Sequence, residues 1–507
     1  MISRPPLVPS RWRGRDVRPR RQAAPCACAD AHARGLLIGN HRFTASVRSA
    51  SIARSNPPAR EAGLLARGYR RMHLALFLAP AGCHHAGWRA LAESTPDPLD
   101  VMQLVELTRR AEAAKFDLVF MADKLSIDDI YGGSFADALA VRALEWPDPF
   151  AVLSALSVVT THIGLAGTIS SSFAHPFPVA RTLATLDHLS AGRAGFNVVT
   201  STSGGEARNF GATLPAHEER YWRAEAFIDA LRTLWDTWGD DAIVADAASG
   251  VYARGERVRR ADIDTPWFAS RGPLTVRRPP QGHPVAIQAG GSRAFSDAAA
   301  RHADVIFASE KPTLAAALEH AHDLRRRVTA EGRAPGSLKI LPGLQPVIGR
   351  TRADAEEKLR FLQERLNPLA TLTHLSNTMD YDWSQHALDD LVPDLLPKIE
   401  RKERFADLIG HARAERMTVR EFTQWMGRGG FGLVGTADDV ATHMADWYRA
   451  GAVDGFVVMP PTVPGDSGRF FDEVVPRLQR LGVFRSEYRE RTLRERLGLA
   501  PVERVSS

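Results

Sequence analysis

Residues 163–201 read IGLAGTISSSFAHPFPVARTLATLDHLSAGRAGFNVVTS, and this stretch points to the architecture of the chain. Two continuous apolar runs, 163–170 and 194–201, flank a helix-like segment from Pro176 to Ser190 that ends near Gly192. Apolar runs that are continuous rather than alternating are typical of parallel strands buried on both faces. The stretch therefore predicts a strand, a helix and a second, parallel strand.

The same pattern recurs along the chain from Met72 onward. Further apolar runs are found at 73–80, 117–123, 284–290, 304–309, 338–349 and 455–460. Eight strand–helix units are the number that closes a barrel, so the sequence predicts an α/β fold, a (β/α)₈ TIM barrel. A doubly wound open sheet is the alternative. Helix starts are expected at Asp97-Pro98 and at Thr436, which with Asp439 resembles a capping box.

Two stretches interrupt this repeat. Residues 240–283 are rich in Gly, Pro and charge and predict an excursion with a hairpin, whereas 350–430 mix helices with a polar centre. Long insertions at the C-terminal face of a barrel commonly form lids over the active site. The predicted domain organisation is a barrel over 72–507 with insertions at about 240–283 and 350–430.

The basic charge of the chain belongs to residues 1–71. They hold fifteen Arg, no Lys and three acidic residues, and the rest of the chain has 50 basic and 56 acidic residues. We interpret the segment as a disordered extension, an over-extended start ahead of Met72, or a targeting peptide. No basic and aromatic motif follows, so no nucleic-acid partner is expected.

Cysteine use and hydropathy bear on the compartment. Only Cys83 lies outside residues 1–71, which fits a reducing cytoplasm. The sequence contains no apolar run of about 18 residues, so no membrane span is expected.

Side chains at the C-terminal ends of barrel strands face the active site. The predicted strand ends carry hydroxyl, amide and carboxyl groups: Asp123, Thr168, Asn197, Thr200, Ser201 and Ser292. A metal cluster, a nucleophile elbow and a P-loop are absent from the sequence. The set suits hydrogen bonding to a bound cofactor better than hydrolysis, and no metal is expected.

Three local motifs permit two interpretations each. QAGGS, residues 288–292, predicts either a phosphate site at a helix N-terminus or an ordinary strand–helix turn capped by Ser292. HEERY places His217 and Tyr221 on one helix face, either as ligand contacts or as a surface helix start. His84 and His85 follow the first strand either as a structural pair or as metal ligands, and no carboxylate with suitable spacing nearby supports the second interpretation.

The ordered motifs resemble the nitrilotriacetate monooxygenase component A family, a branch of the luciferase-like flavin monooxygenases. The resemblance covers residues 73–499. The segments that carry it are GCHHAGWR (82–89), GTISSSFAHPFPVAR (167–181), DHLSAGRAGFNVVTS (187–201), EARNFG (206–211), HEERYWRAEAF (217–227), PQGHPVAIQAGGS (280–292) and DGFVVMPP (454–461).

The resemblance implies an FMN site at five matching positions: Asp123, Thr168, His217, Tyr221 and Ser292. It also implies that Asn197 contacts the ring edge, that Ser292 holds the phosphate, and that His84, His85 and His217 are the catalytic candidates, His217 as a proton donor.

The chain departs from the family pattern at three places. Phe196 stands where the family often has Trp, and Phe295 stands where a glycine is usual. Residues 263–267 read IDTPW in place of the family's Ile-Asp-His-x-Gly. The second departure concerns the phosphate turn, and the third lies near the excursion.

The implied activity is that of the oxygenase component of a two-component system. A separate NAD(P)H-dependent reductase supplies reduced FMN, O₂ converts it to a flavin hydroperoxide, and one oxygen atom enters a small organic substrate. The resemblance also implies a homodimer or homotetramer. The alternatives are a deazaflavin-dependent oxidoreductase, a non-catalytic flavin-binding protein and an unrelated barrel hydrolase. Candidate substrates are organosulfur compounds, aminopolycarboxylates and alkyl chains.

Overall fold

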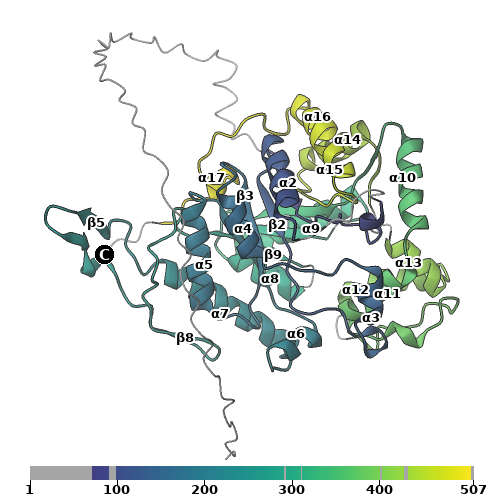
Figure 1. Ribbon diagram of the computed structural model, residues 1–507, viewed down its shortest axis with the longest axis horizontal. Coiled ribbons are helices and arrows are strands. Elements are labelled where there is room, and N and C mark those ends of the chain that lie inside the picture. Colours follow the sequence, from purple (N-terminus) through teal and green to yellow (C-terminus); the bar gives the residue numbers. More distant parts are fainter. Residues whose placement is uncertain are drawn as a thin grey trace, which may run out of the picture. The chain divides into compact units, whose positions relative to one another are not determined.

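Eight parallel strands form a closed barrel, each from one of the eight predicted runs (Figure 1). The computed structural model describes residues 71–90, 97, 99–290, 293–309, 311–399, 402–427 and 432–503. The barrel strands are β1 (His73–Phe77), β2 (Leu118–Met121), β3 (Gly164–Ser170), β4 (Ala194–Val199), β9 (Val285–Ala289), β10 (Val305–Ala308), β11 (Lys339–Leu344) and β14 (Gly455–Val458). The closed order β1-β14-β11-β10-β9-β4-β3-β2 confirms the TIM barrel and excludes the open sheet.

Helices surround the barrel (Figure 1). The longer ones outside the insertions are α2 (Val101–Ala113), α4 (Pro149–Ser157), α5 (Pro176–Leu189), α7 (His217–Trp235), α8 (Arg293–His302), α9 (Leu314–Ala330) and α14 (Ala437–Arg449). Shorter ones are α3 (Ala136–Val141), α6 (Gly204–Asn209), α15 (Gly465–Arg469), α16 (Val475–Arg480) and α17 (Leu493–Arg496). No helix within the described residues is both long and apolar enough to cross a membrane.

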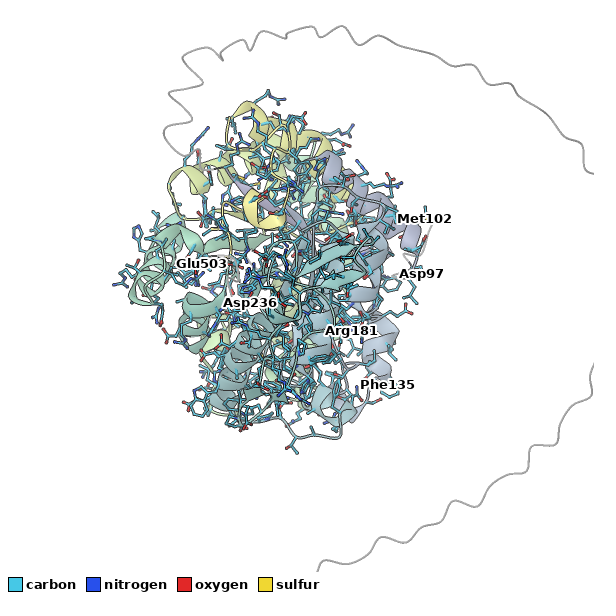
Figure 2. The ribbon with its side chains drawn as sticks, turned by 90° about the vertical axis from the view of Figure 1, so that its left-hand side faces the viewer. Asp97, Met102, Phe135, Arg181, Asp236 and Glu503 are labelled. Atoms are coloured by element: carbon cyan, nitrogen blue, oxygen red, sulfur yellow. The ribbon has the colours of Figure 1, made fainter. Side chains whose placement is uncertain are left out.

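The predicted capping box at Thr436 is confirmed, because Thr436 and Asp439 bond reciprocally at the start of α14. The predicted cap at Asp97 is wrong by three residues. Asp100 caps α2, and its carboxylate accepts hydrogen bonds from Met102 N and Gln103 N. The Asp97 carboxylate accepts from Leu99 N in the turn before the helix. Figure 2 labels Asp97 and also Met102, the second residue of α2.

The run 338–349 is not one strand. β11 ends at Leu344, and β12 (Val347–Gly349) pairs outside the barrel with β13 (Val434–Thr436). Gln345-Pro346 separates the two strands, and proline has no N–H to donate to a strand ladder.

Residues 240–283 contain two antiparallel pairs. They are β5 (Ile243–Asp246) with β6 (Val251–Ala253), and β7 (Ile263–Asp264) with β8 (Ala269–Ser270). Residues 350–430 contain α10 (Arg352–Glu364), α11 (Pro368–Met379), α12 (Lys402–Ala414) and α13 (Val419–Gly427). Figure 1 shows α11, α12 and α13 gathered beside α3. The domain boundary at residue 72 stays a prediction, because residues 1–70 lie outside the described part.

The barrel interior is packed rather than hollow. Apolar side chains from the strands, among them Phe120, Ile287 and Phe307, form one buried cluster with Leu493 of α17 and Leu497, the residue after this helix. α17 therefore closes the N-terminal end of the barrel, and the open polar end is the C-terminal one.

Buried aspartates tie the strands together at the N-terminal end. Asp117 accepts from Leu74 N, Asp304 from Ala286 N and Asp454 from Ile340 N, each on a neighbouring strand. Such contacts at the N-terminal face stabilise a barrel and leave the opposite face for chemistry.

Candidate active site

A cleft of about 610 Å³ opens at the C-terminal ends of β2 and β3. Asp123 and Thr168, both predicted from their positions, lie in its wall. Most of the remaining wall is apolar or aromatic and includes Phe150, Phe173, Val179 and Phe210. The rings of Phe173 and Phe210 stack with centroids 4.7 Å apart. A mostly apolar cleft with a few polar groups is the usual form of a cofactor site.

Asp123 is a partly buried carboxylate in this cleft. Burial raises its pKa to about 6, a hydrogen bond from Lys124 N opposes the shift, and the charges of Asp148 and Glu206 add to it. Near neutral pH the side chain is therefore an ionised acceptor held close to its titration point.

Thr168 and Asn197 lie opposite each other on β3 and β4. Thr168 Oγ1 donates to Met121 O at 3.2 Å and accepts from Asn197 Nδ2 at 3.1 Å. This network fixes the orientation of the Asn197 amide. Asn197 is 2% exposed, and its Oδ1 accepts no hydrogen bond from a described residue. A buried acceptor without a donor suits a ligand that carries an N–H group.

His217 and Tyr221 lie in the first turns of α7, with ring centroids 5.0 Å apart and both rings partly buried. The predicted shared helix face is therefore confirmed. Tyr221 packs against the cluster that contains Phe295 of α8, so α7 and α8 are neighbours. Ser292, the residue predicted to bind the FMN phosphate, lies outside the described residues, and α8 begins at the next residue.

Two of the three departures, Phe196 and Phe295, pack into the apolar interior. Phe196 is buried and its ring lies edge-on to Trp235. The Phe295 ring covers Gly290, where an added Cβ would lie 2.7 Å from Phe295 Cδ2. Phe295 therefore occupies the space that a side chain at residue 290 would need.

His84 and His85 follow β1 at the C-terminal face. Burial lowers the pKa of His84 to about 4. Burial, then the charges of Arg142 and His84, lower the pKa of His85 to about 3. Both imidazoles are therefore neutral at physiological pH and can donate or accept hydrogen bonds.

Sequence reasoning missed two groups beside these histidines. The buried carboxylate of Asp128 pairs with both Lys124 and Arg142. From the second insertion, α11 brings Thr371 Oγ1 to 3.5 Å from His85 Nδ1. The His374 ring lies edge-on to the His85 ring, with centroids 5.3 Å apart. Neither group has a short sequence motif: Arg142 lies 14 residues from Asp128, and Thr371 lies 286 residues from His85.

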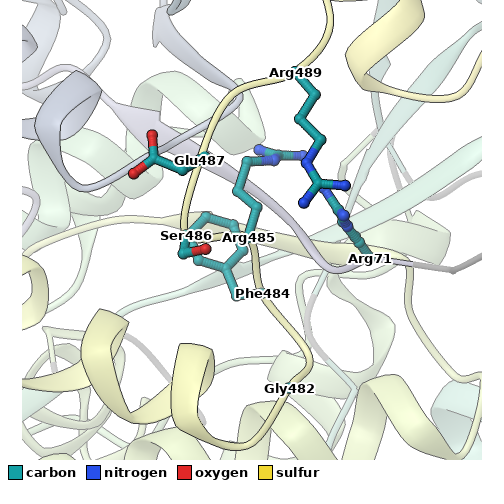
Figure 3. A pocket seen from close by; sticks show the side chains of 7 residues that line it. All are labelled: Arg71, Gly482, Phe484, Arg485, Ser486, Glu487 and Arg489. Carbon is teal, nitrogen blue, oxygen red and sulfur yellow. The ribbon is translucent and has the colours of Figure 1, made fainter. Parts of the chain in front are cut away.

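A smaller cavity of about 160 Å³ lies at the opposite end of the barrel (Figure 3). Arg71, Arg485 and Arg489 line it. Arg485 Nη2 lies 2.7 Å from the buried carboxylate of Asp117, which also contacts His73 Nδ1 at 3.0 Å. These contacts lower the pKa of Asp117 and fasten the barrel end, so this cavity belongs to the stabilising face.

The residues of the C-terminal face fit a reduced flavin. Asn197 Oδ1, on the strand beside Thr168, can accept from a ring N–H. Asp123 supplies a second acceptor in the cleft, whose aromatic wall can cover a planar ring. Among the described residues, no group of three His, Cys, Asp or Glu could hold a metal ion.

Comparison with known proteins agrees with this geometry. The luciferase-like monooxygenase family matches residues 84–454. The chain belongs to that family. This membership confirms the resemblance found in the sequence, and the enzyme is a flavin-dependent monooxygenase.

Two relatives and one solved structure illustrate the similarity. The chain is 38% identical to N-acetyl-S-(2-succino)cysteine monooxygenase of Bacillus subtilis (strain 168), over 86% of this chain and 99% of that protein. It is 37% identical to nitrilotriacetate monooxygenase component A of Aminobacter aminovorans, over 85% of this chain and 97% of that protein. The structure of a riboflavin lyase with modified FMN and riboflavin superimposes with a TM-score of 0.76 at 30% identity, over 86% of this chain and 97% of that chain.

Proposed function

We propose that this luciferase-like monooxygenase is the oxygenase component of a two-component system. It takes up reduced FMN from a separate NAD(P)H-dependent flavin reductase. One atom of O₂ enters a small organic substrate and the other leaves as water, with both electrons supplied by the reduced flavin. We also propose a cytoplasmic location and a homodimer or homotetramer.

The unpaired acceptor of Asn197 at the mouth of the barrel is the observation that carries this proposal. Its partner Thr168 is held by Met121 O, so the amide cannot turn without breaking two hydrogen bonds. Reduced FMN presents ring N–H groups and would satisfy this acceptor. A nicotinamide fingerprint is absent from the sequence, which agrees with reduction by a partner.

Different residues of the chain would bind different parts of the cofactor. Asn197, Thr168 and Asp123 orient the ring, His217 and Tyr221 flank it from α7, and Ser292 with the start of α8 holds the phosphate. The aromatic wall of the cleft excludes water from the reacting centre. Reduced FMN, when bound, supplies the reducing chemistry that activates O₂.

His84, His85 and His217 are the proposed catalytic groups. His84 and His85 are neutral and buried at the end of β1, where they can hold a substrate by hydrogen bonds. For His217 we propose proton donation. Turnover of His217→Ala at saturating flavin tests this role, because undiminished turnover would contradict it.

Oxygen uptake tests the proposed function as a whole. The full chain is mixed with chemically reduced FMN, or with a reduced deazaflavin, and O₂ consumption and hydrogen peroxide release are measured. The proposal expects the protein to slow flavin oxidation and bind FMN in preference to the deazaflavin. Preference for the deazaflavin would contradict it.

A further inference from the structure

Two buried N–H groups follow β1 and have no acceptor among the described residues: His84 Nε2 and Trp88 Nε1. His84 is 4% exposed, and its Nδ1 accepts a hydrogen bond from Ala86 N at 3.0 Å. Burial keeps this imidazole neutral, so the proton must sit on Nε2. Indole Nε1 can only donate. The segment therefore presents two donors and no balancing acceptor.

Buried donors without acceptors cost stability and usually mark a bound partner or a functional site. His84 and Trp88 belong to one turn, because Gly87 N donates to His84 O and the 3₁₀ turn Gly87–Arg89 follows directly. A ligand that satisfies this turn must offer an oxygen or another acceptor. An alkyl chain offers none.

The charges around the turn favour an anionic acceptor. Arg142 acts on His85, and no carboxylate contributes to the pKa shift of either histidine. Arg142 and Lys124 share the carboxylate of Asp128, and Glu206 and Asp129 also act on Lys124, so Lys124 is balanced by carboxylates and Arg142 is the cation that acts on His85. Near this charge, an anion gains Coulomb energy that a neutral sulfone oxygen gains only in part.

We propose that the His84–Trp88 turn binds a carboxylate group of the substrate, so that the enzyme oxygenates a small carboxylate-bearing compound. His84 Nε2–H and Trp88 Nε1–H donate to the carboxylate oxygens, and Arg142 supplies the long-range charge. Thr371 and His374 of α11 pack against His85, so the second insertion closes this end of the site. The assignment rests on the proposed monooxygenase function, whose substrate it specifies.

Titration calorimetry on the full chain loaded with oxidised FMN tests this assignment. Two probes carry carboxylates, nitrilotriacetate and N-acetyl-S-(2-succino)cysteine. Two carry none, dibenzothiophene sulfone and the alkyl-chain alcohol hexadecan-1-ol. We expect a carboxylate probe to bind most tightly. Trp88→Phe keeps an aromatic ring, although a smaller one, and deletes the N–H, and it should weaken carboxylate binding about ten-fold.

A matched pair of variants isolates the second donor. His84→Asn can keep the acceptor for Ala86 N but does not reach Nε2, whereas His84→Gln carries an N–H at about that distance. We expect His84→Asn to lose about ten-fold in carboxylate affinity and His84→Gln to recover most of it. Trp222→Phe, at a site 56% exposed, is the control and should change nothing.

Tightest binding of a probe without carboxylate, or unchanged carboxylate affinity in Trp88→Phe and His84→Asn, would each overturn the proposal. Failure of FMN binding would instead contradict the monooxygenase function, and calorimetry on flavin-free protein would still report the carboxylate.

Discussion

Replacing Asp123 by Asn should stabilise the flavin-free protein at neutral and higher pH while weakening its hold on flavin. Burial raises the pKa of Asp123 from an ordinary 3.8 to about 6. That difference corresponds to about 3 kcal/mol against the ionised form in the folded state. Because the side chain is partly open to the cleft, we expect solvent to reduce this to about 1.5 kcal/mol.

The sign follows from proton linkage. Between about pH 4 and pH 6 the folded state holds more protons at Asp123 than the unfolded state, so stability falls as pH rises through this window. Asn carries no such charge. The gain from Asp123→Asn should therefore be small near pH 4 and reach about 1.5 kcal/mol above about pH 7.

Urea unfolding of the flavin-free full chain at several pH values measures this gain. Asp264→Asn, which removes an exposed carboxylate, is the control and should show little pH-dependent gain. A separate anaerobic titration should show about ten-fold weaker binding of reduced FMN to Asp123→Asn. A gain that is equal at all pH values, or a loss of stability near pH 8, would refute the reasoning.

Three further substitutions test other parts of the account. Asn197→Leu removes the unpaired acceptor, so an anaerobic titration should show affinity for reduced FMN that is lower by ten-fold or more, about 1.5–3 kcal/mol. Unchanged affinity would show that Asn197 is not part of the site. In Gly290→Ala the added Cβ lies 2.7 Å from the Phe295 ring, so the affinity for FMN should fall more than the affinity for riboflavin. The double variant with Phe295→Ala should recover the affinity for FMN. An equal fall for both flavins would show that this turn does not bind the phosphate. Asp117→Asn leaves the Arg485 guanidinium buried without its carboxylate and should cost about 3–5 kcal/mol in urea unfolding, and a cost below about 1 kcal/mol would contradict the stabilising role of that end.

The barrel was readable from the sequence because each strand is buried on both faces. Such strands show as continuous apolar runs, and all eight formed where they were predicted. The errors are local. Asp97 and Asp100 are both suitable caps three residues apart, and only the turn geometry selects Asp100. β12 looked continuous with β11 because Val347 and Ile348 are as apolar as the strand before them.

The candidate site was only partly readable. Asp123, Thr168 and Asn197 were found because strand ends share one face of a barrel. The pairing of Asp128 with Lys124 and Arg142 lies between β2 and the end of α3 but has no periodic pattern. His374 meets His85 across almost three hundred residues, and only the folded chain brings them together. Such contacts depend on how the insertions pack, which local propensity does not encode.

An anaerobic titration of the full chain with reduced FMN, followed by mixing with O₂, tests the central claim most directly. The account predicts tighter binding of reduced than of oxidised FMN, loss of that binding in Asn197→Leu, and slower reoxidation than for free flavin. Reduced FMN that fails to bind, or that reoxidises at the rate of free flavin, would contradict the account.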